Sequence, residues 1–154
     1  MKNIKGIYHY GIAVHNIDEV KNVFTNVLDL ELFQEREIRG EYVDHLVGEV
    51  GSSALVNFFR LTKDEYIETL YWENAVVEGS DILNLSIKKV GATHLCLYVE
   101  DIEEMYKKIY KYDKNCLIST RIVEITNGPN YGSRVFYAKF FSYLFIEFFQ
   151  RHNS

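Results

Sequence analysis

Two stretches of this 154-residue chain show the same change from strand-like to helix-like spacing of apolar residues. After Asn16, apolar residues recur at helical intervals over residues 20–28, and after Asp101 they recur over residues 102–110. Asn16 and Asp101 are residue types that cap helix N-termini, and a glutamate follows three positions after each, as in a capping box. A short β-rich run precedes each cap. Both stretches therefore predict a strand followed by a capped helix.

The same two stretches match residue by residue, which makes the chain an internal repeat. Residues 7–24 align with residues 92–109 at an offset of 85, and this alignment places His9 on His94. After each predicted helix, strand-like segments alternate with turn residues. We expect these strands at Glu41–Val47, Ala54–Leu61 and Tyr66–Trp72 in the first half, and at Ser119–Thr126, Ser133–Phe141 and Leu144–Phe149 in the second.

This order of elements predicts an α+β fold built from two tandem βαβββ modules. The modules are expected to span residues 5–73 and 91–150 of a single domain that covers residues 1–154. Residues 74–90 join them and contain Gly79, Ser80 and Asp81. We interpret this segment as a linker or lid.

Composition narrows the possible partners and the compartment. The net charge is −5 and no dense Lys/Arg run is present, so nucleic acid is not expected as a partner. Aromatic residues make up 15% of the chain, enough for a sizeable core and an aromatic-lined cavity. Cys96 and Cys116 do not form a disulfide framework, which favours a reduced cytoplasmic compartment. The longest apolar stretch, residues 140–149, is too short to span a bilayer, so no membrane partner is expected.

The ends of the two halves also correspond, at an offset of 79 that places Glu68 on Glu147. Each half therefore has a histidine in its first strand and a glutamate in its last. An acidic residue within an apolar strand is costly unless it is paired or coordinates a metal. For any one of His9, Glu68, His94 and Glu147 alone, a structural role is the commoner explanation, but the duplicated order favours four metal ligands.

Two imidazoles and two carboxylates together favour a particular class of metal ion. Such a set suits one divalent ion such as Zn²⁺, Ni²⁺, Mn²⁺, Co²⁺ or Fe²⁺. A structural zinc site is not expected, because no cysteine is among the ligands. Four protein ligands in an octahedral site leave two positions for water or substrate, which is a catalytic arrangement.

The sequence resembles the vicinal oxygen chelate superfamily, which includes glyoxalase I, methylmalonyl-CoA epimerase, extradiol dioxygenases and fosfomycin- or bleomycin-resistance proteins. The resemblance covers nearly the whole chain and is carried by residues 9–14, 16–17, 24–28, 91–94, 99–102 and 146–147, with a further loop at 128–134. It implies a glyoxalase/dioxygenase-like fold in which the two modules form a cupped mixed sheet around a divalent metal. All four ligand positions match the glyoxalase I pattern best, and they also fit epimerase branches.

One segment departs from the family pattern. Many members carry an Asp-Pro-Asp-Gly turn before the last strand, whereas residues 140–143 here are Phe-Phe-Ser-Tyr. We expect this hairpin to differ in shape, or its aromatic tip to face a partner subunit.

The resemblance implies a metal-dependent lyase or isomerase that acts on a small oxygen-chelating substrate by proton transfer through a metal-bound enediolate. Glu147 or Glu68 serves as the base, and Glu147 is preferred because its strand is the more apolar. Two alternatives stay open. The first is an Fe²⁺-dependent extradiol dioxygenase, although those enzymes use two His and one Glu. The second is a non-catalytic binding or resistance protein, which the aromatic content favours slightly.

Other side chains were considered as contacts for the small-molecule substrate. The candidates are Arg60, Asn57, Asn130, Arg134 and Tyr137. His45 is not expected to be a ligand, because it has no counterpart in the other half; nor are His15, which precedes a helix cap, and His152, which lies in the C-terminal tail. A homodimer is expected, since one chain offers only a modest sheet.

Overall fold

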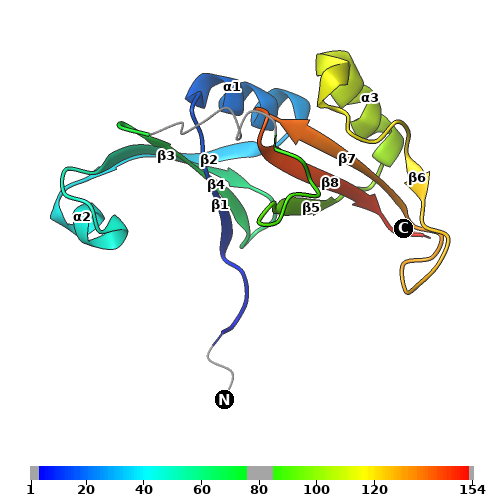
Figure 1. Cartoon of the computed structure of the whole chain (residues 1–154), viewed down its shortest axis with the longest axis horizontal. Helices are drawn as coiled ribbons and strands as arrows, with labels where there is room; N and C mark the ends of the chain where they lie inside the picture. Colours follow the sequence, from blue (N-terminus) through cyan, green and yellow to red (C-terminus); the bar gives the residue numbers. More distant parts are fainter. Residues whose placement is uncertain (1–3, 76–84, 153–154) are drawn as a thin grey trace. The chain divides into compact units, whose positions relative to one another are not determined.

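The computed structural model describes residues 4–75 and 85–152. The expected linker or lid therefore lies largely outside the described residues. The chain divides into two compact units, Met1–Val77 and Glu78–Ser154 (Figure 1). Among the helices described, none is long and apolar enough to cross a membrane.

The first unit is a four-stranded mixed sheet with the strand order β1-β4-β3-β2. Strand β1 runs parallel to β4, and the remaining pairs are antiparallel. Its elements, in chain order, are β1 (His9–Ala13), α1 (Ile17–Asn22), the π-helical turn η1 (Val23–Val27), β2 (Glu31–Arg39), α2 (Glu41–Val47), β3 (Ser53–Arg60) and β4 (Tyr66–Trp72).

The second unit repeats this topology with the strand order β5-β8-β7-β6. Strand β5 is parallel to β8, as β1 is to β4. Its elements are β5 (His94–Tyr98), α3 (Ile102–Asp113), the 3-10 turn η2 (Lys114–Cys116), β6 (Val123–Glu124), β7 (Arg134–Phe140) and β8 (Leu144–Gln150). The predicted α+β fold with a duplicated module is thereby confirmed.

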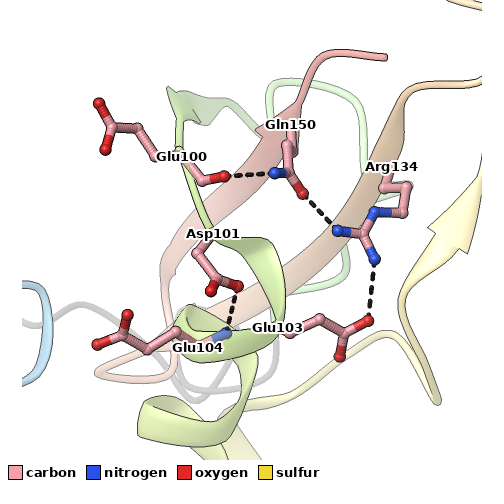
Figure 2. Close-up of polar contacts among 6 residues, drawn as sticks. All are labelled: Glu100, Asp101, Glu103, Glu104, Arg134 and Gln150. Atoms are coloured by element: carbon pink, nitrogen blue, oxygen red, sulfur yellow. Dashed lines mark hydrogen bonds and ion pairs between the residues drawn. The ribbon is translucent and has the colours of Figure 1, made fainter. Parts of the chain in front are cut away.

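Both main helices begin at the predicted caps. The Asn16 side chain accepts a hydrogen bond from the backbone N–H of Glu19 at 3.1 Å. The Asp101 side chain accepts one from Glu104 at 2.9 Å (Figure 2). Each bond satisfies a backbone donor that the first helical turn leaves unpaired.

The apolar side of each helix packs on one face of the sheet in its own unit. In the first unit the rings of Phe24 and Phe59 lie 4.8 Å apart, and both residues are fully buried. In the second unit Tyr106 of α3 packs on Phe136 of β7 at 5.1 Å. Burying a side chain of this size stabilises the fold by about 1.5–3 kcal/mol. Because strand side chains alternate between faces, the histidines and glutamates of interest are left on the opposite face.

The prediction of a strand at Glu41–Val47 is wrong, because these residues form α2. Glycines with positive φ, Gly40 (94°) and Gly48 (78°), bracket this helix, and the N–H of Gly48 donates to Asp44 at 2.8 Å. The strand that follows the first helix of the module is instead β2, and the prediction missed it. Only Ile38 is buried along β2, so its charged sequence gives little alternation of apolar residues.

Residues 140–143, which differ from the family pattern, form a tight hairpin turn. The N–H of Tyr143 donates to the carbonyl of Phe140 at 3.2 Å, and β7 pairs with β8 on either side. Phe141 and Ser142 both have positive φ, 55° and 69°. Positive φ at both central residues is typical of the type I′ turn that joins twisted strands.

Candidate functional site

In the first unit, β1 and β4 bring one histidine and one glutamate together. The register pairs Gly11 with Glu68, and His9 lies two residues before Gly11 on the same face. The Nε2 atom of His9 lies 3.1 Å from Oε2 of Glu68, and the side chains are 34% and 16% exposed. The Nδ1 atom of His9 is buried without a hydrogen bond among the described residues. Nε2 is therefore the ring nitrogen that faces a polar group.

In the second unit, β5 and β8 build the same pair. The register pairs Cys96 with Glu147, and Nε2 of His94 lies 3.0 Å from Oε2 of Glu147. The hydroxyl of Tyr137, on β7, donates to the same Oε2 atom at 2.8 Å. The two His–Glu pairs thus occupy equivalent positions in the two units.

The neighbours of the two glutamates differ. Phe58 is the β3 neighbour of Glu68, and a Cβ on Gly11 would lie 3.4 Å from Oε2 of Glu68. In the second unit, Tyr137 and Cys96 occupy the corresponding places. Burial and the hydrogen bond to Glu147 raise the pKa of the Tyr137 phenol above its usual range. Loss of surrounding water, and then the charge of Glu147, raise the pKa of the Cys96 thiol.

Each pair has the donors and spacing that two ligands of one metal need. Two donors about 2.1 Å from an ion and at a right angle stand about 3 Å apart. The N···O separations of 3.1 and 3.0 Å match that spacing, and nitrogen with carboxylate oxygen suits a borderline divalent ion. Over residues 4–75 and 85–152, no group of three or more His, Cys, Asp or Glu side chains is placed to hold a metal. Each unit by itself therefore supplies two of the predicted ligands.

Arg60, a predicted substrate contact, lies on the same face as the first pair. It follows Phe58 by two residues, and the register pairs it with Tyr66 at the end of β4. Its Nε atom is 3.2 Å from a carboxylate oxygen of Glu31, and its guanidinium carbon stands 4.2 Å from the centre of the Phe33 ring. The cation of Arg60 is thus already engaged within its unit.

The structure places two other predicted substrate contacts on the helix-covered face of their sheets, opposite the pair of the same unit. Asn57 is fully buried there, beside Thr69 rather than Glu68. Arg134 donates to Glu103 at 3.0 Å and to Gln150 at 2.6 Å (Figure 2). The Arg134 contacts tie β7 to α3 and β8, and neither residue is beside the pair of its own unit.

The remaining predicted residues lie outside both pairs. Asn130 is exposed in the loop before β7, and its carbonyl accepts from the N–H of Ser133 at 3.0 Å. His45 is exposed on α2, with Nε2 3.5 Å from Glu41. His152 packs on Gly132, where a Cβ would lie 2.9 Å from its ring.

Sequence reasoning missed an aromatic cluster around His9. Tyr66 lies at its centre, with ring centroids 5.7 Å from Tyr8, 5.3 Å from Phe33 and 6.1 Å from Phe58. Phe33 could not be placed from the sequence, because β2 was not predicted. Tyr8 directly precedes His9 in the sequence, and this position could have indicated the other aromatic residues around His9.

A pocket of ≈ 490 Å³ opens at the far end of β1 and β4 in the same unit. Its lining includes Ala13, Val47, Val50 and Trp72. Ala13 and Trp72 follow His9 and Glu68 by four residues each and share their face. This pocket therefore lies on the face that carries the first pair.

Comparisons with known proteins agree with this topology. No protein-family model matches the sequence, and no curated protein matches it. Among solved structures, a glyoxalase family protein from Bacillus cereus superposes with a TM-score of 0.80 at 18% identity, covering 98% of each chain. The fosfomycin resistance protein FosX from Listeria monocytogenes gives 0.60 at 14% identity, covering 97% of this chain and 96% of FosX. A lactoylglutathione lyase from Agrobacterium tumefaciens gives 0.57 at 15% identity, with 97% and 96% covered. The resemblance drawn from the sequence is confirmed at the level of the fold: this chain has the fold of the glyoxalase, bleomycin-resistance and dioxygenase proteins.

Proposed function

We propose that this protein is a divalent-metal-dependent lyase or isomerase that moves a proton on the carbon beside a carbonyl of a small substrate. The observation that carries the proposal is the duplicated His–Glu pair, with His9 3.1 Å from Glu68 and His94 3.0 Å from Glu147. Fold neighbours that include a lactoylglutathione lyase and FosX support an enzymatic role. The substrate would present two adjacent oxygens, as a hydroxyketone or a hemithioacetal does.

The four ligands in this proposal are His9, Glu68, His94 and Glu147. When bound, a divalent ion would polarise the carbonyl and stabilise negative charge on the substrate oxygens. The atoms that would bind the ion are Nε2 of each histidine and Oε2 of its partner carboxylate, which face each other in both pairs. One carboxylate must also take a proton from the substrate carbon and return it.

We propose Glu147 as that base. The hydroxyl of Tyr137 and the ring of His94 both contact Oε2 of Glu147, at 2.8 and 3.0 Å. Because Oε2 accepts from Tyr137 and would bind the ion beside His94, we assign proton transfer to Oε1. Tyr137 is then a positioning residue, and Glu68 is the carboxylate that stays with the ion.

The test is solvent deuterium exchange at the carbon next to the carbonyl. Hydroxyacetone, and separately the hemithioacetal of methylglyoxal and glutathione, would be incubated in D₂O with protein loaded with Zn²⁺, Ni²⁺, Mn²⁺ or Co²⁺. NMR would follow loss of the C–H signal, with metal content measured in parallel. We expect Glu147→Gln to keep metal, because the amide still offers an oxygen of similar size, and to lose about 10²–10⁴-fold in exchange rate.

A matched control is Glu124→Gln, on β6, where the register pairs Glu124 with Arg134. This variant should exchange at the wild-type rate. The proposal fails if Glu68→Gln and Glu147→Gln both keep metal and both exchange as fast as wild type. Oxygen uptake with catechols and Fe²⁺ would then favour a dioxygenase, and metal-free protein that binds small aromatics would favour a binding protein.

We further propose that the protein acts as a homodimer on a small-molecule substrate. Phe141 and Tyr143 at the β7–β8 turn are half-buried within their unit and offer an aromatic tip for a second copy. Sedimentation at micromolar concentration tests this proposal, and a monomer there would contradict it.

A further inference from the structure

The pocket at the far end of β1 and β4 is walled mostly by apolar side chains. Its volume of ≈ 490 Å³ lies within the range of small-molecule sites. Ala13 ends β1 and Trp72 ends β4, while Val47 and Val50 come from the end of α2 and the loop after it. The pocket begins four residues along the strands from the first His–Glu pair, a separation of about 13 Å. A small molecule bound here therefore need not touch that pair.

Contacts within the first unit hold both walls of this pocket. In the loop that carries Val50, the N–H of Ser52 donates to a carboxylate oxygen of Asp44 at 2.9 Å. The Ser52 hydroxyl donates to the carbonyl of Glu49 at 2.8 Å. On the other side, Trp72 packs against a buried apolar cluster formed by β2, α2 and β3. The pocket is thus built from fixed parts of the unit.

Carboxylates dominate the charge of the pocket. Glu49 is the one residue with an ionisable side chain among the described residues that line it. Two more carboxylates accept hydrogen bonds from lining residues: Asp44 from Ser52, and Glu73 from the hydroxyl of Ser53. This surrounding disfavours an anionic ligand and favours a positive charge.

Cations on the neighbouring elements of this unit already have partners. Arg39, the β2 neighbour of Ser53 in the register, donates to Glu37 at 2.7 Å. The guanidinium of Arg36 lies 5.7 Å from the centre of the Phe58 ring, and His45 of α2 lies 3.5 Å from Glu41. None of these three cationic side chains lines the pocket.

The second unit fills the equivalent place with its own side chains. The repeat places Tyr98 on Ala13 and Arg151 on Trp72. The guanidinium carbon of Arg151 lies 5.5 Å from the centre of the Tyr98 ring, which is a cation–π contact. The first unit has an aromatic ring here, that of Trp72, but it has alanine in place of the tyrosine and no cation in the described lining. A cationic ligand over Trp72 would give the first unit the same kind of contact.

We propose that this pocket binds an alkylammonium ion. The positive charge lies over the Trp72 ring and beside Glu49, and the alkyl groups contact Val47 and Val50. Tryptophan is the strongest cation–π partner among the aromatic side chains, and quaternary ammonium ions are ligands that aromatic sites recognise. The site stands on its own contacts and does not depend on the metal chemistry proposed for the His–Glu pairs.

The test compares choline with 3,3-dimethylbutan-1-ol, which has the same shape but a carbon atom in place of the charged nitrogen. Trp72 is the sole tryptophan, so its indole N–H gives a single signal in the ¹⁵N–¹H NMR spectrum of the whole chain. We expect choline at millimolar concentrations to shift this signal until it saturates, whereas sodium chloride at the same concentrations does not. The neutral alcohol should bind about tenfold more weakly than choline.

Two variants keep Trp72 as the reporter and change its surroundings. Glu49→Gln removes the negative charge, so it should weaken choline binding about threefold to fivefold and leave binding of the alcohol unchanged. Ala13→Tyr introduces the residue of the second unit and should abolish binding of both compounds by filling the pocket. Ala13 is exposed, so the larger side chain should not prevent folding. Glu41→Gln, on an exposed part of α2 outside the lining, is the matched control and should bind choline as wild type does.

Three results would overturn the proposal. Equal binding of choline and the alcohol would show that the charge is not recognised. Choline binding that survives both Glu49→Gln and Ala13→Tyr without change would place the ligand outside this pocket. An indole signal that choline does not move, or that sodium chloride moves equally, would show that no alkylammonium ion binds over Trp72.

Discussion

At the scale of single residues, the two glutamates hold the same place in the repeat but have different neighbours. Glu68 has Gly11 and Phe58 beside it, which crowd it little and give it no further hydrogen bond. Glu147 has the Tyr137 hydroxyl at 2.8 Å. Glu147 is therefore held more firmly than Glu68. Two carboxylates with different roles in proton transfer need such a difference in their surroundings.

Removing the Tyr137 hydroxyl tests how firmly Glu147 is held. A hydrogen bond to a charged group contributes about 1.5–3 kcal/mol, and this one lies in a partly buried part of its unit. We expect Tyr137→Phe to lower the free energy of unfolding by about 1–2 kcal/mol in urea denaturation. Tyr110→Phe, which removes a hydroxyl from an exposed position on α3, should change it by less than about 0.5 kcal/mol. Equal effects in the two variants would show that the hydrogen bond is not formed in solution.

The Cys96 thiol reports on the same carboxylate through its pKa, which burial and then the charge of Glu147 raise above its usual range. Because the thiolate is the reactive form, a raised pKa lowers the alkylation rate at pH 8 and moves its rise with pH to higher values. We expect Cys96 in a Cys116→Ser background to react with iodoacetamide more slowly than a free thiol. Glu147→Gln removes the negative charge, so it should speed the reaction. A slower reaction in that variant would contradict the assignment.

The pairing of His9 with Glu68, and of His94 with Glu147, could be anticipated because the repeat and the two-residue period of strands both point to it. Asn57 and Arg134, predicted as substrate contacts, do not follow that same period. Asn57 lies eleven residues before Glu68, but its β4 partner is Thr69, so it cannot share a face with Glu68. Arg134 is three residues before Tyr137 on one strand, which also puts the two on opposite faces. Register between strands was the missing information.

At the scale of elements, the caps, the helices and most strands followed from local signals, whereas β2 and α2 did not. Strand β2 is an edge strand whose side chains are almost all exposed, so burial leaves no pattern in its sequence. Helix α2 has one buried residue, Val43, and its ends are set by two glycines. Elements with so little buried surface depend on their ends and on tertiary packing, which apolar spacing does not record.

The β7–β8 turn offers a test of strain at this scale. Ser142 has φ of 69°, a left-handed conformation that costs a residue with a Cβ about 1–2 kcal/mol. Glycine adopts it without that cost, so Ser142→Gly should raise the free energy of unfolding by about 0.5–1 kcal/mol. Asp64→Gly, in the β3–β4 connection of the first unit, is the matched control. Asp64 does not have positive φ, so glycine there should be neutral or destabilising. Stabilisation by both variants, or by neither, would contradict the strained turn.

At the scale of the whole molecule, duplication gives each unit one imidazole and one carboxylate. Two protein ligands are fewer than the three or four that metalloenzyme sites use, so a pair alone should bind a divalent ion weakly. Under the proposed function, tight binding is expected only where both pairs contribute ligands. The number of ions bound per chain distinguishes a shared site from two separate ones.

We expect purified protein to bind about one divalent ion per chain, measured by elemental analysis after removal of free metal. His9→Ala and His94→Ala should each lose most of it, since either change leaves one unit with a lone carboxylate in place of a two-ligand pair. His45→Ala and His152→Ala are the controls: His45 is exposed on α2, and His152 packs on Gly132, so neither should change occupancy by much. About two ions per chain, with each ligand variant losing half, would mean that the pairs bind metal independently. Full occupancy in both ligand variants would rule out the metal site, and with it the proton-transfer chemistry proposed for Glu147.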